Sequence, residues 1–209
     1  MPKGSEELTN ARKEEIISAC AELYLTKGFR DITISDIGNK TSFTRTSIYN
    51  YFQTKEEIFL ALLQREHEAW RNDLQAIAAG YKLLNTDEFA GELAHTLEKR
   101  GCMLKLMSMN LYDMERSSRL ENLVEFKKAY GAAMQALDDC LQKFFPQMTE
   151  SDRQEFLFSF FPFLFGVYPY TSVTAKQMQA METAGVSYPH YSIYGLTKTV
   201  AAKLLAPFK

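Results

Sequence analysis

The chain has 209 residues, 46% of them hydrophobic and 24% charged, so it is long enough to bury a core in one or two domains. Its 24 Lys and Arg residues face 26 Asp and Glu residues, and the net charge of −2 excludes a protein that binds nucleic acid through a global basic field. Any contact with a polyanion must come from a local patch.

The three cysteines, Cys20, Cys102 and Cys140, are widely spaced and form no CxxC pair. We therefore expect reduced thiols, with neither a disulfide framework nor a metal site. The N-terminal segment MPKGSEELTN lacks the apolar stretch of a signal peptide, so a cytoplasmic protein is expected.

The first third of the chain carries the signals of a compact helical head. Apolar residues recur at helical spacing over residues 16–24, and Gly28 is placed to stop that helix in a left-handed cap. N-capping patterns follow at Thr33, Thr44 and Thr54, and an acid stands three residues after the first and the third. The last of these is a full capping box that opens a longer helix.

The remaining residues also predict helices. A break at Asn85 precedes one helix, a Met- and Leu-rich segment covers residues 103–114, and Ser117 or Ser118 begins a long helix ending near residue 145. Thr149 caps the next helix. The last helix carries an apolar stripe of Ile193, Leu196, Val200 and Leu204. The fold class is all-α, without an internal repeat.

Residues 44–52, TRTSIYNYF, have two chemically different faces when placed on a helix. Ile48 and Phe52 face inward. The outward face carries short donors, an amide and a guanidinium, contributed by Thr44, Arg45, Thr46, Ser47, Tyr49 and Asn50. Such groups suit base edges and phosphates, because Arg pairs with guanine and Asn with adenine. A polar connector that only caps and solubilises the chain is the alternative that composition alone leaves open.

From Ile16 to Ile58 the order of residues resembles the N-terminal domain of the TetR (tetracycline repressor) family of bacterial transcriptional regulators. The resemblance is carried by Ile16-Ile17, Ala19, Leu23-Tyr24, Gly28-Phe29, Thr33-Ile34, Asp36-Ile37, Ile48-Tyr49, Phe52 and Lys55-Glu56-Glu57. It implies an N-terminal three-helix helix-turn-helix domain, over residues 8–54, whose third helix enters the major groove. Residues 55–209 would then form a larger helical domain for effector binding and dimerisation.

The resemblance also implies roles for single residues. Thr33, Tyr49 and Lys55 correspond to phosphate anchors, and Arg45, Thr46, Ser47 and Asn50 to base-facing positions. The turn departs from the family pattern, because Thr41-Ser42-Phe43 stands where Gly is usual. Ser42 is therefore expected to adopt a left-handed or strained conformation. Gly38 stands where the family has Ala, at a cost in helix propensity.

Two apolar segments of the C-terminal part are candidate walls of an effector cavity. Residues 103–114, MLKLMSMNLYDM, offer adaptable Met side chains, and residues 158–170 are strongly aromatic around Pro162, where a kink is expected. The candidate ligand-binding residues are Trp70, Met103, Met107, Asn110, Phe161, Phe165 and Tyr168. For each of them singly, plain core packing is the alternative.

Other chemistries are poorly supported by the sequence. Glu92-x-x-His95 has the spacing of a di-iron ligand pair, but the chain offers no second pair. Neither a Gly-rich phosphate loop nor a GxSxG motif is present, so we expect no enzyme and no cofactor. Residues 156–175 approach transmembrane length, but Pro162, Gly166 and Pro169 interrupt them, so a buried helix is favoured over a membrane span.

The sequence thus predicts a homodimeric, ligand-responsive transcription factor, expected to be a repressor released from DNA by its effector. Its partners would be a palindromic double-stranded operator and a small hydrophobic effector. The alternative is a helical small-molecule binding protein whose N-terminal head does not bind DNA.

Overall fold

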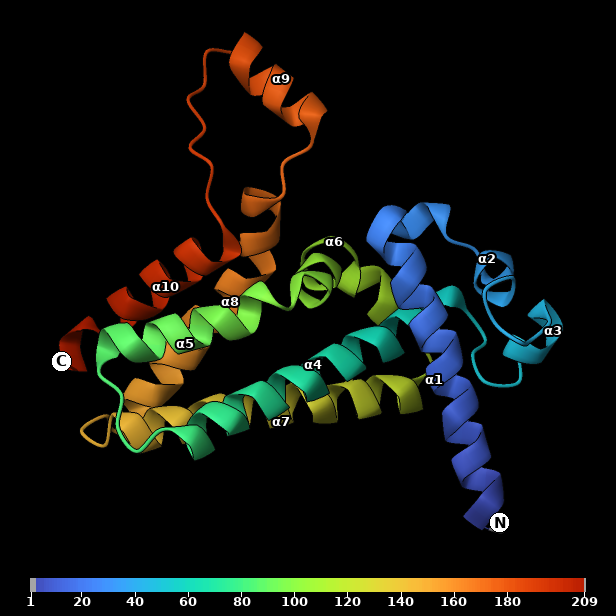
Figure 1. Cartoon of the computed structure of the whole chain (residues 1–209), viewed down its shortest axis with the longest axis horizontal. Coiled ribbons are helices and arrows are strands. Elements are labelled where there is room, and N and C mark those ends of the chain that lie inside the picture. The colour runs from blue at the N-terminus through green and yellow to red at the C-terminus, as the bar shows by residue number, and fades with distance from the viewer. Residues whose placement is uncertain (1–2, 209) are drawn as a thin grey trace. The chain divides into compact units, whose positions relative to one another are not determined.

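In a computed structural model that describes residues 3–208, the chain is helical throughout, and those residues include no β-strand (Figure 1). The helices are α1 (Lys3–Thr26), η1 (Phe29–Asp31), α2 (Ile34–Gly38), α3 (Arg45–Ile48), α4 (Lys55–Gly80), α5 (Thr86–Glu98), α6 (Gly101–Ser117), α7 (Leu120–Phe144), α8 (Glu150–Thr171), α9 (Ala175–Thr183), α10 (Ile193–Leu204) and η2 (Ala206–Phe208). The predicted all-α class is confirmed.

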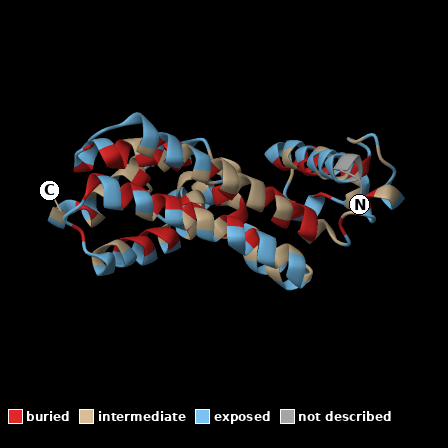
Figure 2. Cartoon of the chain, turned by 90° about the horizontal axis from the view of Figure 1, so that it is seen from below, coloured by how far each residue is buried: buried red, intermediate tan, exposed pale blue. Residues whose placement is uncertain are grey.

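The chain folds into two compact units, and α4, α6 and α7 each contribute to both. The first unit comprises residues 1–67 and 109–130, and the second comprises residues 68–108 and 131–209. Buried and exposed residues alternate along the helices in the manner of amphipathic packing (Figure 2). Each unit therefore has a core of its own, described in turn below.

The core of the first unit joins the N-terminal head to the start of α4. Phe59 on α4 packs its ring 5.2 Å from that of Tyr24 and 4.6 Å from that of Phe29. Ile48 and Phe52 are buried, as the helical pattern of residues 44–52 predicts. Burial of these side chains anchors the short helices α2 and α3, which are too short to be stable alone in water.

Local capping accounts for most helix starts. Thr33 accepts the N–H of Asp36, whose carboxylate accepts the N–H of Thr33 in return, and Thr44, Asn85 and Thr149 cap α3, α5 and α8. The capping box at Thr54 is only half formed. Thr54 accepts the N–H of Glu57, but the Glu57 carboxylate turns to the N–H of Gln53. The caps predicted at Thr33, Thr44 and Thr149 are present, and the cap predicted at Thr54 is present in modified form. Asn85, where the sequence predicts a break, is an N-cap as well.

The structure corrects four expectations about the head and the long helices. The helix expected over residues 44–52 is α-helical only to Ile48; residues 49–51 continue as a turn in which the N–H groups of Asn50 and Tyr51 reach back three residues. Gly28 has φ −76° and starts η1, so it is no left-handed cap. No non-glycine residue among those described has positive φ, and Ser42 is therefore not left-handed. The helix expected at Ser117 or Ser118 begins at Leu120.

In the second unit, α10 packs against α5 and α8. The buried face of α10 is formed by Thr197 and Ala201, whereas the predicted stripe of Ile193, Leu196, Val200 and Leu204 is only half-buried. In the same core, the ring of Phe89 lies 5.7 Å from that of Phe144 and 5.5 Å from that of Phe145. The apolar stripe is thus displaced by one residue from the face that packs inside the unit.

Helix α8 continues through Pro162 and Pro169, and α9 follows it on an extended connection (Figure 1). The sequence reading missed α9, although Thr174 and Gln177 form a capping box at its start. None of the residues of α9 is buried. No single helix within residues 3–208 is long and apolar enough to cross a membrane; α8 and α9 meet that criterion only as a pair bent by 80°.

Candidate nucleic-acid interface

The segment predicted to contact DNA is exposed. The side chains of Thr33, Thr44, Arg45, Thr46, Tyr49 and Asn50 are exposed, while Ser47 and Lys55 are half-buried. Burial of Ile48 and Phe52 holds the opposite face of this segment against the head. The structure thus separates an inward apolar face from an outward polar face, as the helical pattern predicts, even though the regular helix stops at Ile48.

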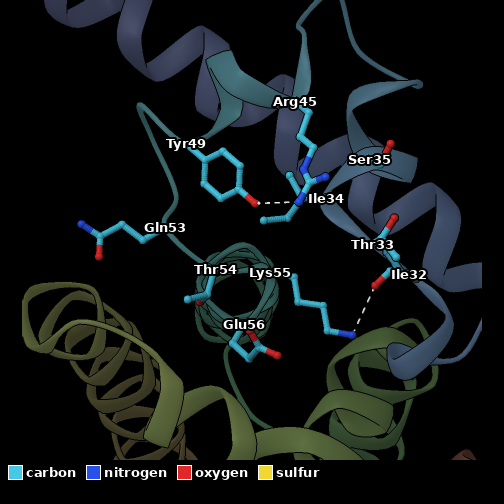
Figure 3. Close-up of a pocket in the computed structure, with 10 residues that line it drawn as sticks. All are labelled: Ile32, Thr33, Ile34, Ser35, Arg45, Tyr49, Gln53, Thr54, Lys55 and Glu56. Atoms are coloured by element: carbon cyan, nitrogen blue, oxygen red, sulfur yellow. Dashed lines mark hydrogen bonds between the residues drawn. The ribbon is translucent and has the colours of Figure 1, made fainter.

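A hollow of about 600 Å³ lies on one side of this segment, and Figure 3 shows the ten residues that line it. They are Ile32, Thr33, Ile34, Ser35, Arg45, Tyr49, Gln53, Thr54, Lys55 and Glu56. The lining combines hydroxyls, a guanidinium and an ammonium with the N-terminus of the 26-residue helix α4. Hydroxyls, cations and the positive end of a helix dipole are the groups that hold phosphate oxygens.

Arg45 lies against Tyr49 at the rim of this hollow. Its Nη2 donates to the Tyr49 hydroxyl over 3.4 Å, and its guanidinium carbon lies 5.9 Å from the centre of the tyrosine ring (Figure 3). The ring limits the positions that the guanidinium can take, so Arg45 needs less ordering to contact a base or phosphate.

Lys55 is tied to the loop that leads into α2. Its Nζ donates to the carbonyl oxygens of Phe29 at 2.9 Å and Ile32 at 3.2 Å, and lies 4.6 Å from the centre of the Phe29 ring. These bonds use two of the three ammonium donors. Lys55 therefore fastens the start of α4 to the head, in addition to any contact that it makes with an anion.

A second hollow, of about 550 Å³, lies on the other side of the exposed segment. It is lined by Leu8, Ala11, Arg12, Glu15, Ser42, Phe43, Ser47, Asn50 and Tyr51. Arg12 donates to the Tyr51 hydroxyl over 3.1 Å and lies 5.8 Å from the centre of the Phe43 ring. The sequence reading missed Arg12, because only the fold brings α1 beside the turn before α3.

Two carboxylates of the first unit, Asp36 and Glu57, have their pKa lowered by hydrogen bonds. The pKa of Asp36 is lowered to about 2, chiefly by the hydrogen bond from the Thr33 hydroxyl and then by the Thr33 N–H. Burial by itself would raise the pKa of Glu57, but hydrogen bonds from Arg119 and from the N–H groups of Gln53 and Arg119 outweigh it and lower that pKa. Both groups are therefore carboxylates at neutral pH.

The Glu57–Arg119 pair connects the end of the exposed segment to the junction of α6 and α7. Arg119 donates from Nε to one oxygen of Glu57 over 2.7 Å and from Nη2 to the other over 3.0 Å, and it also reaches the Tyr51 carbonyl at 3.4 Å. Glu57 is 1% exposed. Sequence gave no signal for this pair, whose members are 62 residues apart.

His67 is a core histidine of the same unit. It is fully buried, its Nδ1 lies 2.9 Å from the Leu63 carbonyl oxygen, and its ring lies 5.6 Å from those of Phe126 and Tyr130. Desolvation lowers its pKa to about 4. The imidazole is therefore neutral at physiological pH, and Nδ1–H donates to the carbonyl.

The candidate ligand-binding residues divide between the two units. In the second unit, Trp70 is fully buried, donates to the Thr96 hydroxyl over 3.0 Å and lies 5.7 Å from the ring of Phe161. Met103, Met107 and Phe161 are buried, and Phe165 and Tyr168 are half-buried. In the first unit, the Asn110 side-chain oxygen accepts from the Tyr24 hydroxyl over 3.3 Å. Trp70 and Phe161 are thus brought together, and Asn110 has a partner in the head.

Comparison with known proteins identifies both parts of the chain. Residues 16–62 match the model of bacterial regulatory proteins of the tetR family, and residues 64–204 match the tetracyclin repressor-like C-terminal domain. The HTH-type transcriptional regulator YdgC of Bacillus subtilis is 37% identical over 59 residues, which are 28% of this chain and 30% of that protein. The chain thus aligns with about a third of this relative's length.

Solved structures extend the likeness to the whole fold. The fatty acid degradation regulator FadR from Bacillus halodurans aligns with a TM-score of 0.61 and 16% identity, over 93% of this chain and 94% of that one. The regulator FadR from Bacillus subtilis, solved with stearoyl-CoA, has a TM-score of 0.58 and 16% identity over 94% of this chain and 99% of that one. With family models matching the head and most of the remaining chain, the protein belongs to the TetR family of bacterial regulatory proteins.

Proposed function

We propose that the protein is a sequence-specific transcriptional repressor that binds DNA as a homodimer and is released by a small apolar effector. The observation that carries DNA binding is the exposed polar face of residues 44–50 between two hollows, one of which gathers Arg45, Lys55 and the N-terminus of α4. In this reading the domain boundary is as the sequence suggests, with residues 8–54 binding DNA and residues 55–209 binding effector and partner. The protein then acts in the cytoplasm, where bacterial DNA lies.

Specificity is assigned to the residues at the start of α3 and in the turn after it. Arg45, Thr46, Ser47 and Asn50 face base edges, while Thr33, Tyr49 and Lys55 contact phosphates. Thr44, the N-cap of α3, lies beside them on the DNA-binding surface. The near-neutral net charge does not oppose this, because helix N-termini and hydroxyls bind phosphates without a large net charge.

A dimer is supported by apolar surface on α8 and α10. The side chains of Phe158 and Tyr170 on α8 are 70% and 62% exposed, and the half-buried stripe of Ile193, Leu196, Val200 and Leu204 lies on α10. Exposed apolar side chains of this kind in a monomer would stay in water at a cost. Two-fold symmetry of the dimer would require a palindromic operator with half-sites about 34–36 Å apart, or a multiple of that.

The effector site is proposed in the second unit around Trp70, Met103, Met107, Phe161, Phe165 and Tyr168. Met and aromatic side chains suit an apolar or aromatic guest. FadR of Bacillus subtilis, a neighbour in fold, was solved with stearoyl-CoA, which supports an apolar effector but does not name this one. Effector and operator would oppose each other through one coupling free energy.

The deciding experiment is selection of bound sequences from random duplex DNA by the full-length protein. We expect a palindromic consensus whose affinity falls with salt, because phosphate contacts release counterions. Failure to enrich any sequence would refute the repressor assignment and favour a small-molecule binding protein. A thermal-shift screen of apolar compounds follows, in which a true effector raises the melting temperature and weakens operator binding.

A further inference from the structure

The turn between α2 and α3 is held by a carboxylate from α1. The Ser42 N–H donates to Oε1 of Glu15 over 2.7 Å, and the Ser42 hydroxyl donates to Oε2 over 3.2 Å. Both oxygens of Glu15 are thus used by one residue that lies 27 positions further along the chain. Glu15 is half-buried and directly precedes Ile16, which is fully buried, so α1 presents the carboxylate from a fixed position.

The chemistry of the turn explains why such an acceptor is useful. A residue with a Cβ pays a penalty in the left-handed region that glycine avoids, and no described non-glycine residue adopts it here. Beside Ser42, Thr41 bonds the chain locally: its hydroxyl donates to the Gly38 carbonyl over 3.0 Å and accepts the Phe43 N–H over 3.3 Å. The Ser42 N–H has no such local acceptor and is satisfied by Glu15 instead.

Thr44, the N-cap of α3, follows this turn by two residues. Any change in the path of the chain at Ser42 therefore changes the direction in which α3 leaves the turn. Glu15 and Ser42 also line the same hollow as Ser47 and Asn50, two of the residues proposed to face bases. The Glu15 carboxylate thus lies beside residues that are proposed to face the DNA bases.

We propose that Glu15 is a positioning residue for DNA recognition, which fixes the glycine-free turn and thereby the orientation of α3. This inference rests on the proposed DNA-binding function. It predicts that removal of the Glu15 carboxylate weakens DNA binding, which is opposite to the effect expected from its charge alone. A carboxylate beside a DNA-binding surface repels phosphates, so its removal would strengthen binding if Glu15 acted only as a charge.

The test compares full-length Glu15→Ala, Glu15→Gln and Glu14→Ala with the unaltered protein, using the operator obtained by selection and a random duplex of equal length. Glu14 is the matched control, since its carboxylate is on the same helix but pairs with Arg65, 3.4 Å away. We expect Glu15→Ala to bind the operator about 5–10-fold more weakly, the effect of losing charge-assisted hydrogen bonds at a part-exposed site. Glu15→Gln, which keeps one acceptor, should fall between, and Glu14→Ala should bind no more weakly than the unaltered protein.

A second substitution separates positioning from general destabilisation. Ser42→Gly placed in Glu15→Ala should restore most of the lost operator affinity, because glycine can close the turn in conformations that need no carboxylate. If Glu15 merely stabilised the head, the added glycine would weaken binding further. Circular dichroism confirms folding of each variant, and Glu15→Gln serves if Glu15→Ala is unfolded.

Failure of the Glu15 proposal can be distinguished from failure of the proposed DNA-binding function. If the unaltered protein selects no operator, the repressor assignment fails. If it selects one and Glu15→Ala binds it equally well or better, or if Ser42→Gly restores nothing, the positioning role of Glu15 is wrong and DNA binding stands.

Discussion

Arg119→Ala is expected to destabilise the protein strongly, because it leaves the buried Glu57 carboxylate without its cation. Glu57 is 1% exposed, and the Arg119 side chain is 35% exposed. Removing one partner of a fully buried pair costs about 3–5 kcal/mol. Since water reaches part of the guanidinium, we expect a smaller loss in the free energy of unfolding, about 2–3 kcal/mol.

The matched control is Lys128→Ala. The Lys128–Glu125 pair has the same N–O distance as Arg119–Glu57, 2.7 Å, but its side chains are 67% and 57% exposed. An exposed pair contributes at most about 1 kcal/mol. The two substitutions therefore compare a buried pair with two hydrogen bonds and an exposed pair with one, at the same shortest distance.

Thermal denaturation followed by circular dichroism measures the difference. For a chain of this size, about 1 kcal/mol corresponds to about 2–4 °C, so Arg119→Ala should lower the melting temperature by about 4–12 °C and Lys128→Ala by no more than a few degrees. The gap should also depend on pH. The folded-state pKa of Glu57 lies below its ordinary 4.5, so its stabilisation is present above pH 4.5 and is lost as the pH falls through the folded value. Equal shifts for both variants, or a gap that widens in acid, would refute this account.

Four further variants test other parts of the molecule. Gly38→Ala should raise the free energy of unfolding by about 0.5–1 kcal/mol, measured by chemical denaturation. Alanine has the higher helix propensity, and a Cβ at this position meets its nearest neighbours at 3.5 Å or more. A loss of stability would show that the site has no room for the methyl group. Lys55→Ala should weaken binding to all DNA sequences alike and reduce the slope of log K against log salt concentration by about one unit. It should also destabilise the head, because the hydrogen bonds to two carbonyls are lost. A changed base preference with full affinity would contradict the phosphate assignment. Asn50→Ala should alter the preferred base at one operator position, because a bidentate contact contributes about 1–3 kcal/mol of discrimination between bases. The base preference at each position is measured by selection of bound sequences. Unchanged preferences would show that other residues recognise the bases. Val200→Glu with Leu204→Glu should give monomers in sedimentation and abolish operator binding, since charges would lie on the proposed interface; a DNA-competent dimer would place that interface on another surface.

Sequence alone determined where most helices begin. An N-cap is a contact within three residues, so Thr33, Thr44 and Thr149 could be recognised without knowledge of the fold, and the structure confirms each. The inward placement of Ile48 and Phe52 followed from helical periodicity for the same reason. The missed helix α9 carries an equally local signal at Thr174, which shows that such caps are readable wherever they occur.

Only the tertiary structure decided the contacts between residues distant in the chain. The Ser42 N–H finds its acceptor in Glu15, 27 residues away, and Glu57 turns from its capping box toward Arg119, 62 residues away. A residue's nearest partner then depends on which helices pack together, and no local pattern encodes that. The inward face of α10 differs from the predicted apolar stripe for the same reason. Helix α10 packs against α5 and α8 through Thr197 and Ala201, because burial depends on the surface that a helix meets and not on its most apolar side.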